Sequence, residues 1–150
     1  EAELLLFEAS RAQLVRRVIE PALEAGKWVV SDRFMDSTTA YQGYGRGIDL
    51  GAVSEINRFA VGTTVPDLTI LLDLDVSAGI ARLRRRNAAA GNGADRIERE
   101  ALEFHERVRR GYLELARRYP DRIVTVDASR KPDQVAGDVL RIVAERLGVK

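Results

Sequence analysis

The sequence contains no cysteine, which excludes a disulfide framework and any zinc site built on thiolates. It has no apolar run near the length of about 18 residues that a membrane-spanning helix needs, and it does not open with a signal-peptide pattern. It also lacks an excess of charge, since 24 Lys and Arg against 23 Asp and Glu leave +1. Overall charge therefore gives no indication of a nucleic-acid or membrane partner, and we expect a cytoplasmic protein.

The composition is typical of a globular protein, with 45% hydrophobic and 31% charged residues. At 150 residues we expect one domain, spanning 1–150, with room for a substantial core. The chain lacks an initiator methionine and begins at once with a helical pattern. We therefore expect a further segment upstream of Glu1.

Apolar segments along the chain predict strands that alternate with helices. Three nearly continuous apolar runs, typical of parallel strands covered on both faces, predict strands at 27–32, 65–75 and 122–128. Helices are expected at 2–25, 49–62, 76–87, 96–120 and 131–148. This order predicts an α/β fold with a mostly parallel sheet. Three strands are few for so many helices, so we expect the first strand or strands of the sheet to lie upstream.

Two residues are expected to interrupt or to cap the predicted helices. Pro21 cannot donate a hydrogen bond to Arg17, so it should kink the first helix or begin its last turn. Asp49 is expected to cap the helix at 49–62.

The polar stretch SDRFMDSTTAYQGYGRG at 31–47 follows the first expected strand, where ligands bind in parallel sheets. We interpret it as a binding loop. Its Arg33 suits bidentate phosphate binding, with Asp32 beside it to orient the guanidinium. From the residue types alone, a structural ion pair between Asp32 and Arg33 stays open as the alternative.

The same stretch offers hydrogen-bonding groups of the kind that contact a base or a sugar: Ser37, Thr38, Thr39, Tyr41 and Gln42. Capping of a short helical turn by Asp36 or Ser37 is the alternative, but it does not account for Tyr41 and Gln42. We interpret the glycine pattern of Gly43–Gly47 as a flexible loop rather than a dinucleotide fingerprint.

An aromatic residue and an arginine share one face of the first helix. Phe7 and Arg11 are four residues apart, so the ring can stack on a flat base while the guanidinium bonds its carbonyl. The alternative is a structural role, in which Phe7 packs in the core and Arg11 lies at the rim of the core.

Arginines crowd the end of the helix expected at 76–87, namely Arg82, Arg84, Arg85 and Arg86. A small-residue segment follows at 88–95, so we expect a mobile lid over about 82–98. Arginines on a lid neutralise the charge of a phosphoryl group in transfer and exclude water. A solvated helix end, where the dipole favours cations, is the alternative. The only histidine, His105, is expected to be an ordinary surface residue.

Four motifs follow one another along the chain: Phe7-x-x-x-Arg11, Asp32-Arg33 after a strand, Tyr41-Gln42-Gly43 and an arginine-rich lid ending in DRIE. In order and spacing they resemble bacterial thymidylate kinase (dTMP kinase) over essentially the whole chain. The resemblance implies a P-loop nucleoside-monophosphate-kinase-like parallel sheet flanked by helices. It also implies transfer of the ATP γ-phosphate to dTMP with Mg²⁺, for dTTP biosynthesis. The family further implies a homodimer built through helices, and a first helix that is apolar on most sides is compatible with one.

The resemblance implies a role for each motif residue of the acceptor site. Phe7 stacks on thymine, Arg11 hydrogen-bonds the base and Arg33 holds the dTMP phosphate. The remaining contacts are Ser37 or Thr38 at the polar edge of thymine, Tyr41 against the deoxyribose, and Gln42 as a further wall.

The resemblance also implies roles in the lid. Arg82, Arg84 and Arg86 match its catalytic arginines, with Arg86 in contact with the transferred phosphoryl group. Asp95 matches a substrate contact, and Glu98 matches an acidic position near the magnesium ion.

One departure from the family leaves alternatives open. The pattern G-x-x-x-x-G-K-[ST] of its phosphate loop occurs nowhere in the sequence. The chain therefore resembles the C-terminal three-quarters of the enzyme, and a chain that ended at Glu1 is expected to be inactive. A deoxynucleoside kinase is one alternative, but it needs a carboxylate base, for which Asp32 is the only candidate. A non-enzymatic fragment or interaction module is the other.

Overall fold

The computed structural model describes the backbone of residues 1–88 and 97–148, and the side chains of residues 1–84 and 102–148. The chain groups into two compact units, Glu1–Pro66 and Asp67–Lys150. Each unit has its own helices and its own packing. The single domain expected over 1–150 stays a prediction.

The first unit begins with one long helical segment. Its parts are α1 (Ala2–Leu14), the π-helical η1 (Val15–Ile19) and α2 (Glu20–Glu24). This confirms the helix expected at 2–25, and Pro21 lies in the first turn of its last part, in line with the prediction. Because Pro21 has no N–H to donate to Arg17, the regular bonding pattern is interrupted there. The wider π turn lies directly ahead of it.

Within the stretch 31–47, residues 35–45 are helical where the sequence predicted a loop. It contains α3 (Met35–Thr38) and the π-helical η2 (Thr39–Gly45). Neither Asp36 nor Ser37 is the cap, because α3 begins at Met35 after Phe34 without a side-chain cap. Gly43 is buried, and a Cβ there would lie 2.6 Å from Leu50 Cδ2. This glycine permits a close approach of two segments instead of supplying a flexible loop.

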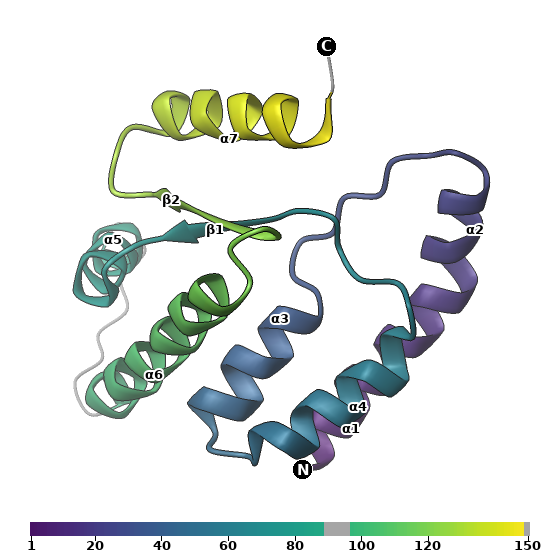
Figure 1. The fold of residues 1–150 in the computed structure, drawn as a ribbon. Helices are drawn as coiled ribbons and strands as arrows, with labels where there is room; N and C mark the ends of the chain where they lie inside the picture. Colours follow the sequence, from purple (N-terminus) through teal and green to yellow (C-terminus); the bar gives the residue numbers. More distant parts are fainter. Residues whose placement is uncertain (89–96, 149–150) are drawn as a thin grey trace. The chain divides into compact units, whose positions relative to one another are not determined.

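The helix α4 (Leu50–Val61) confirms the cap predicted from the sequence. The Asp49 carboxylate accepts from the backbone N–H of Ala52 at 2.8 Å. The helix lies alongside α1 (Figure 1), and its Val61 joins Val15 and Ile19 in the core of this unit.

The strand expected at 27–32 is absent from the structure of the described residues. Val29 packs against the core of the first unit, while Trp28 and Val30 are 65% and 93% exposed. A strand needs a neighbour to bond its backbone, and no described segment pairs with this one. The apolar pattern alone was therefore misleading here.

The second unit is built on two parallel strands. In β1 (Thr69–Asp73) and β2 (Ile123–Asp127), Thr69 lies opposite Ile123 and Asp73 opposite Asp127. The helices are α5 (Val76–Ala88), α6 (Ile97–Arg118) and α7 (Pro132–Leu147). Helices α6 and α7 cover opposite faces of the sheet (Figure 1). These elements confirm the predicted parallel α/β arrangement, with two of the three expected strands formed in the described residues.

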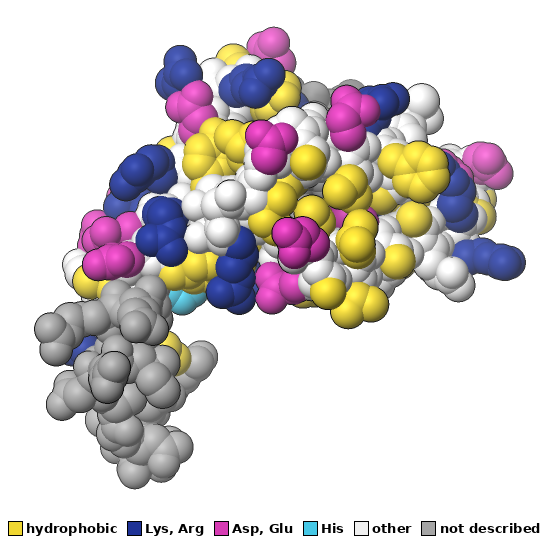
Figure 2. Space-filling view, turned by 90° about the horizontal axis from the view of Figure 1, so that it is seen from below, with side chains coloured by type: hydrophobic (Ala, Val, Ile, Leu, Met, Phe, Trp, Pro, Cys, Tyr) yellow, Lys and Arg dark blue, Asp and Glu magenta, His cyan; other side chains and the backbone are white. Residues whose placement is uncertain are grey.

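Large apolar side chains remain exposed on α1. Leu5, Leu6 and Phe7 are 55%, 72% and 53% exposed, whereas Leu4 is buried. Hydrophobic side chains are visible among charged ones on the surface in Figure 2. Within the described residues, no helix has both the length and the apolar character that crossing a bilayer demands.

Two glycines give opposite predictions for stability. Gly62 ends α4 at φ 59° and ψ −123°, a conformation that strains any L-residue. We expect Gly62→Ala to lower the free energy of unfolding by about 1–3 kcal/mol. The control is Gly137→Ala in α7, where an added Cβ meets nothing within 4 Å, so it should raise stability by about 0.5–1 kcal/mol. Urea unfolding midpoints of both variants test this, and equal shifts would contradict it.

Candidate functional site

A polar cluster in the first unit is centred on Arg11. Its Nη1 donates to Thr38 Oγ1 at 2.7 Å and to Asn57 Oδ1 at 3.4 Å, and its Nη2 donates to the Phe34 carbonyl at 3.3 Å. Nη1 also bonds Glu8, and the guanidinium lies 5.5 Å from the centre of the Phe34 ring. Segments far apart in sequence therefore meet at one arginine.

The buried partner of Arg11 is Glu8, whose side chain is 4% exposed and forms an ion pair with it. Glu8 Oε1 also accepts from the Thr38 hydroxyl at 2.7 Å. Its other oxygen, Oε2, is buried and has no hydrogen-bond partner among the described residues. An unsatisfied buried acceptor costs about 1–3 kcal/mol, so stability alone is a poor reason for an acid here.

Asn57 completes the cluster from α4. It is 2% exposed, and its Nδ2 donates to Thr39 Oγ1 at 3.1 Å and to the Met35 carbonyl at 3.3 Å. Sequence reasoning missed both Glu8 and Asn57. The available indication for Glu8 was an acid three residues before Arg11 on one helix, a spacing that favours an ion pair.

The positive charge of Arg11 is compensated by carboxylates within the cluster. Burial lowers the pKa of Arg11, and the nearby Asp36 opposes that shift. Glu8 and Asp36 are 3% and 5% exposed, so two buried acids face this arginine. A compensated guanidinium of this kind suits a neutral polar group better than an anion.

Arg33 differs from Arg11 in both backbone and surroundings. It is the one non-glycine residue with a positive φ, 67°, in the described part of the chain, and Ser31 Oγ donates to its carbonyl at 2.9 Å. Its guanidinium lies 5.1 Å from the centre of the Tyr41 ring. Among the described residues no carboxylate lies within ion-pair distance of it, so the alternative of a structural Asp32–Arg33 pair is not found.

The other acceptor-site candidates are placed as follows. Phe7 is 53% exposed, which rejects the alternative of a core phenylalanine with Arg11 at its rim. Ser37 and Tyr41 are half-buried. Gln42 is buried, and its Nε2 donates to Glu3 at 2.7 Å, which lowers the pKa of the Glu3 carboxyl.

The lid candidates are described only in part. Arg82 donates from Nη1 to the Ala128 carbonyl and from Nη2 to the Ser129 carbonyl, both at 3.1 Å. These carbonyls follow β2, so Arg82 is tied to the carboxyl end of the sheet. Arg84 is exposed. The side chains of Arg86, Asp95 and Glu98 lie outside the described residues.

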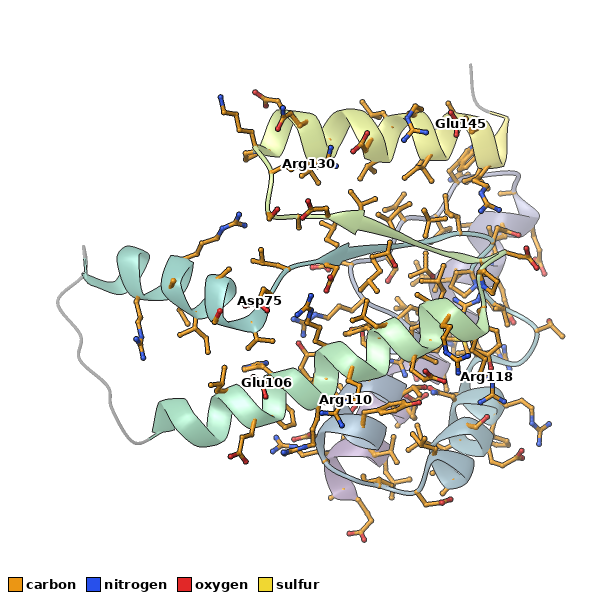
Figure 3. The ribbon with its side chains drawn as sticks, turned by 60° about the vertical axis from the view of Figure 1, so that its left-hand side comes forward. Asp75, Glu106, Arg110, Arg118, Arg130 and Glu145 are labelled. Carbon is orange, nitrogen blue, oxygen red and sulfur yellow. The ribbon has the colours of Figure 1, made fainter. Side chains whose placement is uncertain are left out.

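The carboxyl end of β1 carries a charged groove within the second unit. Arg109 binds Asp73 through Nε at 2.7 Å and Nη2 at 2.9 Å, and Asp75 through Nη1 at 3.1 Å. The groove of about 440 Å³ runs on to Glu106 and Arg110 of α6, which Figure 3 shows across from Asp75. Asp75 bonds Ser77, which lowers the pKa of the Asp75 carboxyl.

Within the described side chains, no three His, Cys, Asp or Glu residues gather into a cluster that could hold a metal ion. The expected metal ligand, Glu98, is not among those side chains.

The fold is shared with a solved kinase. The crystal structure of thymidylate kinase from Ehrlichia chaffeensis superposes with a TM-score of 0.71 at 31% identity, over 95% of this chain and 63% of that one. The chain thus has a thymidylate-kinase-like α/β fold with parallel strands and helices.

Sequence comparison identifies the family. The family profile described as "Thymidylate kinase" matches residues 1–139. Thymidylate kinases of Cyanothece sp. and Solidesulfovibrio magneticus are 49% and 52% identical over 97% of this chain. The chain covers 62% and 71% of those two proteins. This chain belongs to the thymidylate kinase family.

Proposed function

We propose that the protein transfers the γ-phosphate of ATP to dTMP, giving dTDP for dTTP biosynthesis. The single observation that carries the proposal is the contrast between its two arginines. The Arg11 side chain is 12% exposed and is compensated by Glu8, whereas Arg33 is exposed without a carboxylate partner among the described residues. A neutral base edge suits the first and an anionic phosphate the second. The quoted relatives, all thymidylate kinases, support this assignment.

In this proposal the first unit holds the acceptor nucleotide. Arg33 binds the phosphate, with its strained backbone as an indication of function. The exposed ring of Phe7 stacks on thymine, and Thr38 or Ser37 meets its polar edge. Tyr41 and Gln42 complete the site.

The lid residues are proposed to act on the donor side. Arg82, Arg84 and Arg86 neutralise charge on the phosphoryl group, and Asp95 contacts substrate. A divalent metal, which we propose to be Mg²⁺ near Glu98, accompanies ATP and neutralises phosphate charge when bound. We also propose a homodimer, with the exposed apolar face of α1 as support.

An assay of coupled ADP release on the complete protein tests this function. We expect dTMP to be the preferred nucleoside monophosphate, with kcat/KM about 10²-fold or more above dCMP, because one buried polar contact discriminates at about this level. Thymidine is the matched control, since it offers no phosphate for Arg33. Faster turnover of thymidine than of dTMP would favour the deoxynucleoside kinase alternative, which the comparisons do not favour.

A further inference from the structure

We propose that Glu8 is a positioning residue that sets the base specificity of the acceptor site. Its buried carboxylate fixes the orientation of the Arg11 guanidinium and the direction of the Thr38 hydroxyl hydrogen. The inference rests on the proposed function, because it concerns which base edge the acceptor site takes. The substrate chemistry that fits is an edge with a carbonyl beside an N–H, as in an imide.

A contribution to folding stability does not explain why a buried glutamate occupies position 8. An ion pair this deep gains little over apolar side chains of similar volume, because both charges lose their water. Glu8 Oε2 also lacks a hydrogen-bond partner among the described residues. A group kept at such a cost points to a role other than folding.

The hydrogen bonds show what Glu8 controls. An ionised carboxylate only accepts hydrogen bonds, so the single hydroxyl hydrogen of Thr38 is committed to Glu8 Oε1. Thr38 Oγ1 accepts from Arg11 Nη1 with one lone pair, and its remaining lone pair can only accept. Thr38 is thereby made an acceptor toward a group that enters this cluster, where its side chain is now fully buried.

Arg11 is the matching donor. Its hydrogen bonds to the described residues use Nη1 and one hydrogen of Nη2, so its Nε–H and the second Nη2–H have no partner there. Together Arg11 and Thr38 offer N–H donors beside one acceptor. Thymine presents a carbonyl and an N–H on one edge, whereas cytosine presents an amino group and an unprotonated nitrogen.

The substitution Glu8→Gln tests this in the complete protein. Glutamine removes the charge that holds the Arg11 guanidinium, so Arg11 loses its charge-assisted partner and its fixed orientation, while the amide oxygen can still accept from the Thr38 hydroxyl. We expect the kcat/KM ratio of dTMP to dCMP to fall about tenfold or more, through a higher KM for dTMP with the KM for ATP unchanged. Glu24→Gln, an exposed position in α2, is the matched control and should behave as wild type.

The outcomes distinguish a failure of the proposed function from a failure of the proposed role of Glu8. A wild-type protein that does not phosphorylate dTMP would refute the proposed function. An active wild type with an unchanged ratio and dTMP KM in Glu8→Gln would overturn the role of Glu8 alone. If Glu8→Gln does not fold, Glu8→Met removes the charge and the orphaned oxygen together and is expected to lose the same discrimination. Failure of both variants to fold would assign Glu8 to the fold and also overturn the proposal.

Discussion

Replacing Arg33 by alanine is expected to weaken dTMP binding by about 2–4 kcal/mol, roughly 30- to 900-fold in Kd. The reason is that a desolvated phosphate loses its bidentate partner, and no other arginine in the first unit combines exposure with the contact to Tyr41 among the described residues. Titration calorimetry with dTMP measures the loss. Arg33→Lys keeps the positive charge but lacks the planar guanidinium, so its dTMP affinity should lie between those of the wild type and Arg33→Ala.

A second substitution of Arg33 is expected to affect ligand binding and folding stability in opposite directions. Because Arg33 has φ 67°, Arg33→Gly should relieve backbone strain and raise the free energy of unfolding by about 1 kcal/mol while abolishing the phosphate contact. Arg58→Ala is the control, since its ion pair with Glu55 is exposed on both sides and should affect neither property. An unchanged dTMP affinity in Arg33→Ala would remove Arg33 from the acceptor site.

Arg11→Ala is expected to lower the free energy of unfolding by about 3–5 kcal/mol, because it leaves the Glu8 charge buried without its cation. Urea unfolding measures the loss. The control is Arg16→Ala on the same helical segment. Its ion pair with Glu20 is 50% and 33% exposed, so about 0–1 kcal/mol is expected. Equal losses in the two variants would contradict a buried pair at Arg11.

Arg11→Ala should also narrow the preference for dTMP over dCMP by up to about 3 kcal/mol. The kcat/KM ratio of two substrates is independent of the folded fraction, so this effect separates from the loss of stability. If the ratio survives in Arg11→Ala but collapses in Thr38→Val, the discriminating contact belongs to Thr38 alone.

Local signals in the sequence determined most of the helices. The cap at Asp49, the interruption before Pro21 and the periodicity of α6 and α7 all act within a few residues of chain. Such signals do not depend on distant partners, so they were predictable. The parallel pairing of β1 with β2 was predictable for a related reason, since helices connect the two apolar strands.

Distant contacts overturned two other predictions. The run at 27–32 is as apolar as β1, but a strand exists only where a neighbour bonds its backbone. Gly43 was interpreted as part of a flexible loop, yet it lies buried in η2 against Leu50. The neighbouring residues in the sequence indicate neither that the run at 27–32 has no strand to pair with in the described part of the chain nor that Gly43 packs against Leu50.

The candidate site divides in the same way. The sequence by itself determined which residue types carry the chemistry, because an arginine after an acid and an aromatic four residues before an arginine are local patterns. Only the tertiary structure decided that the Glu8–Arg11 pair is largely withdrawn from solvent, while Arg33 is exposed and has a positive φ. The burial of Arg11 is set by residues up to 46 positions away, such as Asn57, and the Glu8 ion pair gains its weight from that burial. The charge that a ligand meets is therefore a property of the folded first unit and not of the motif.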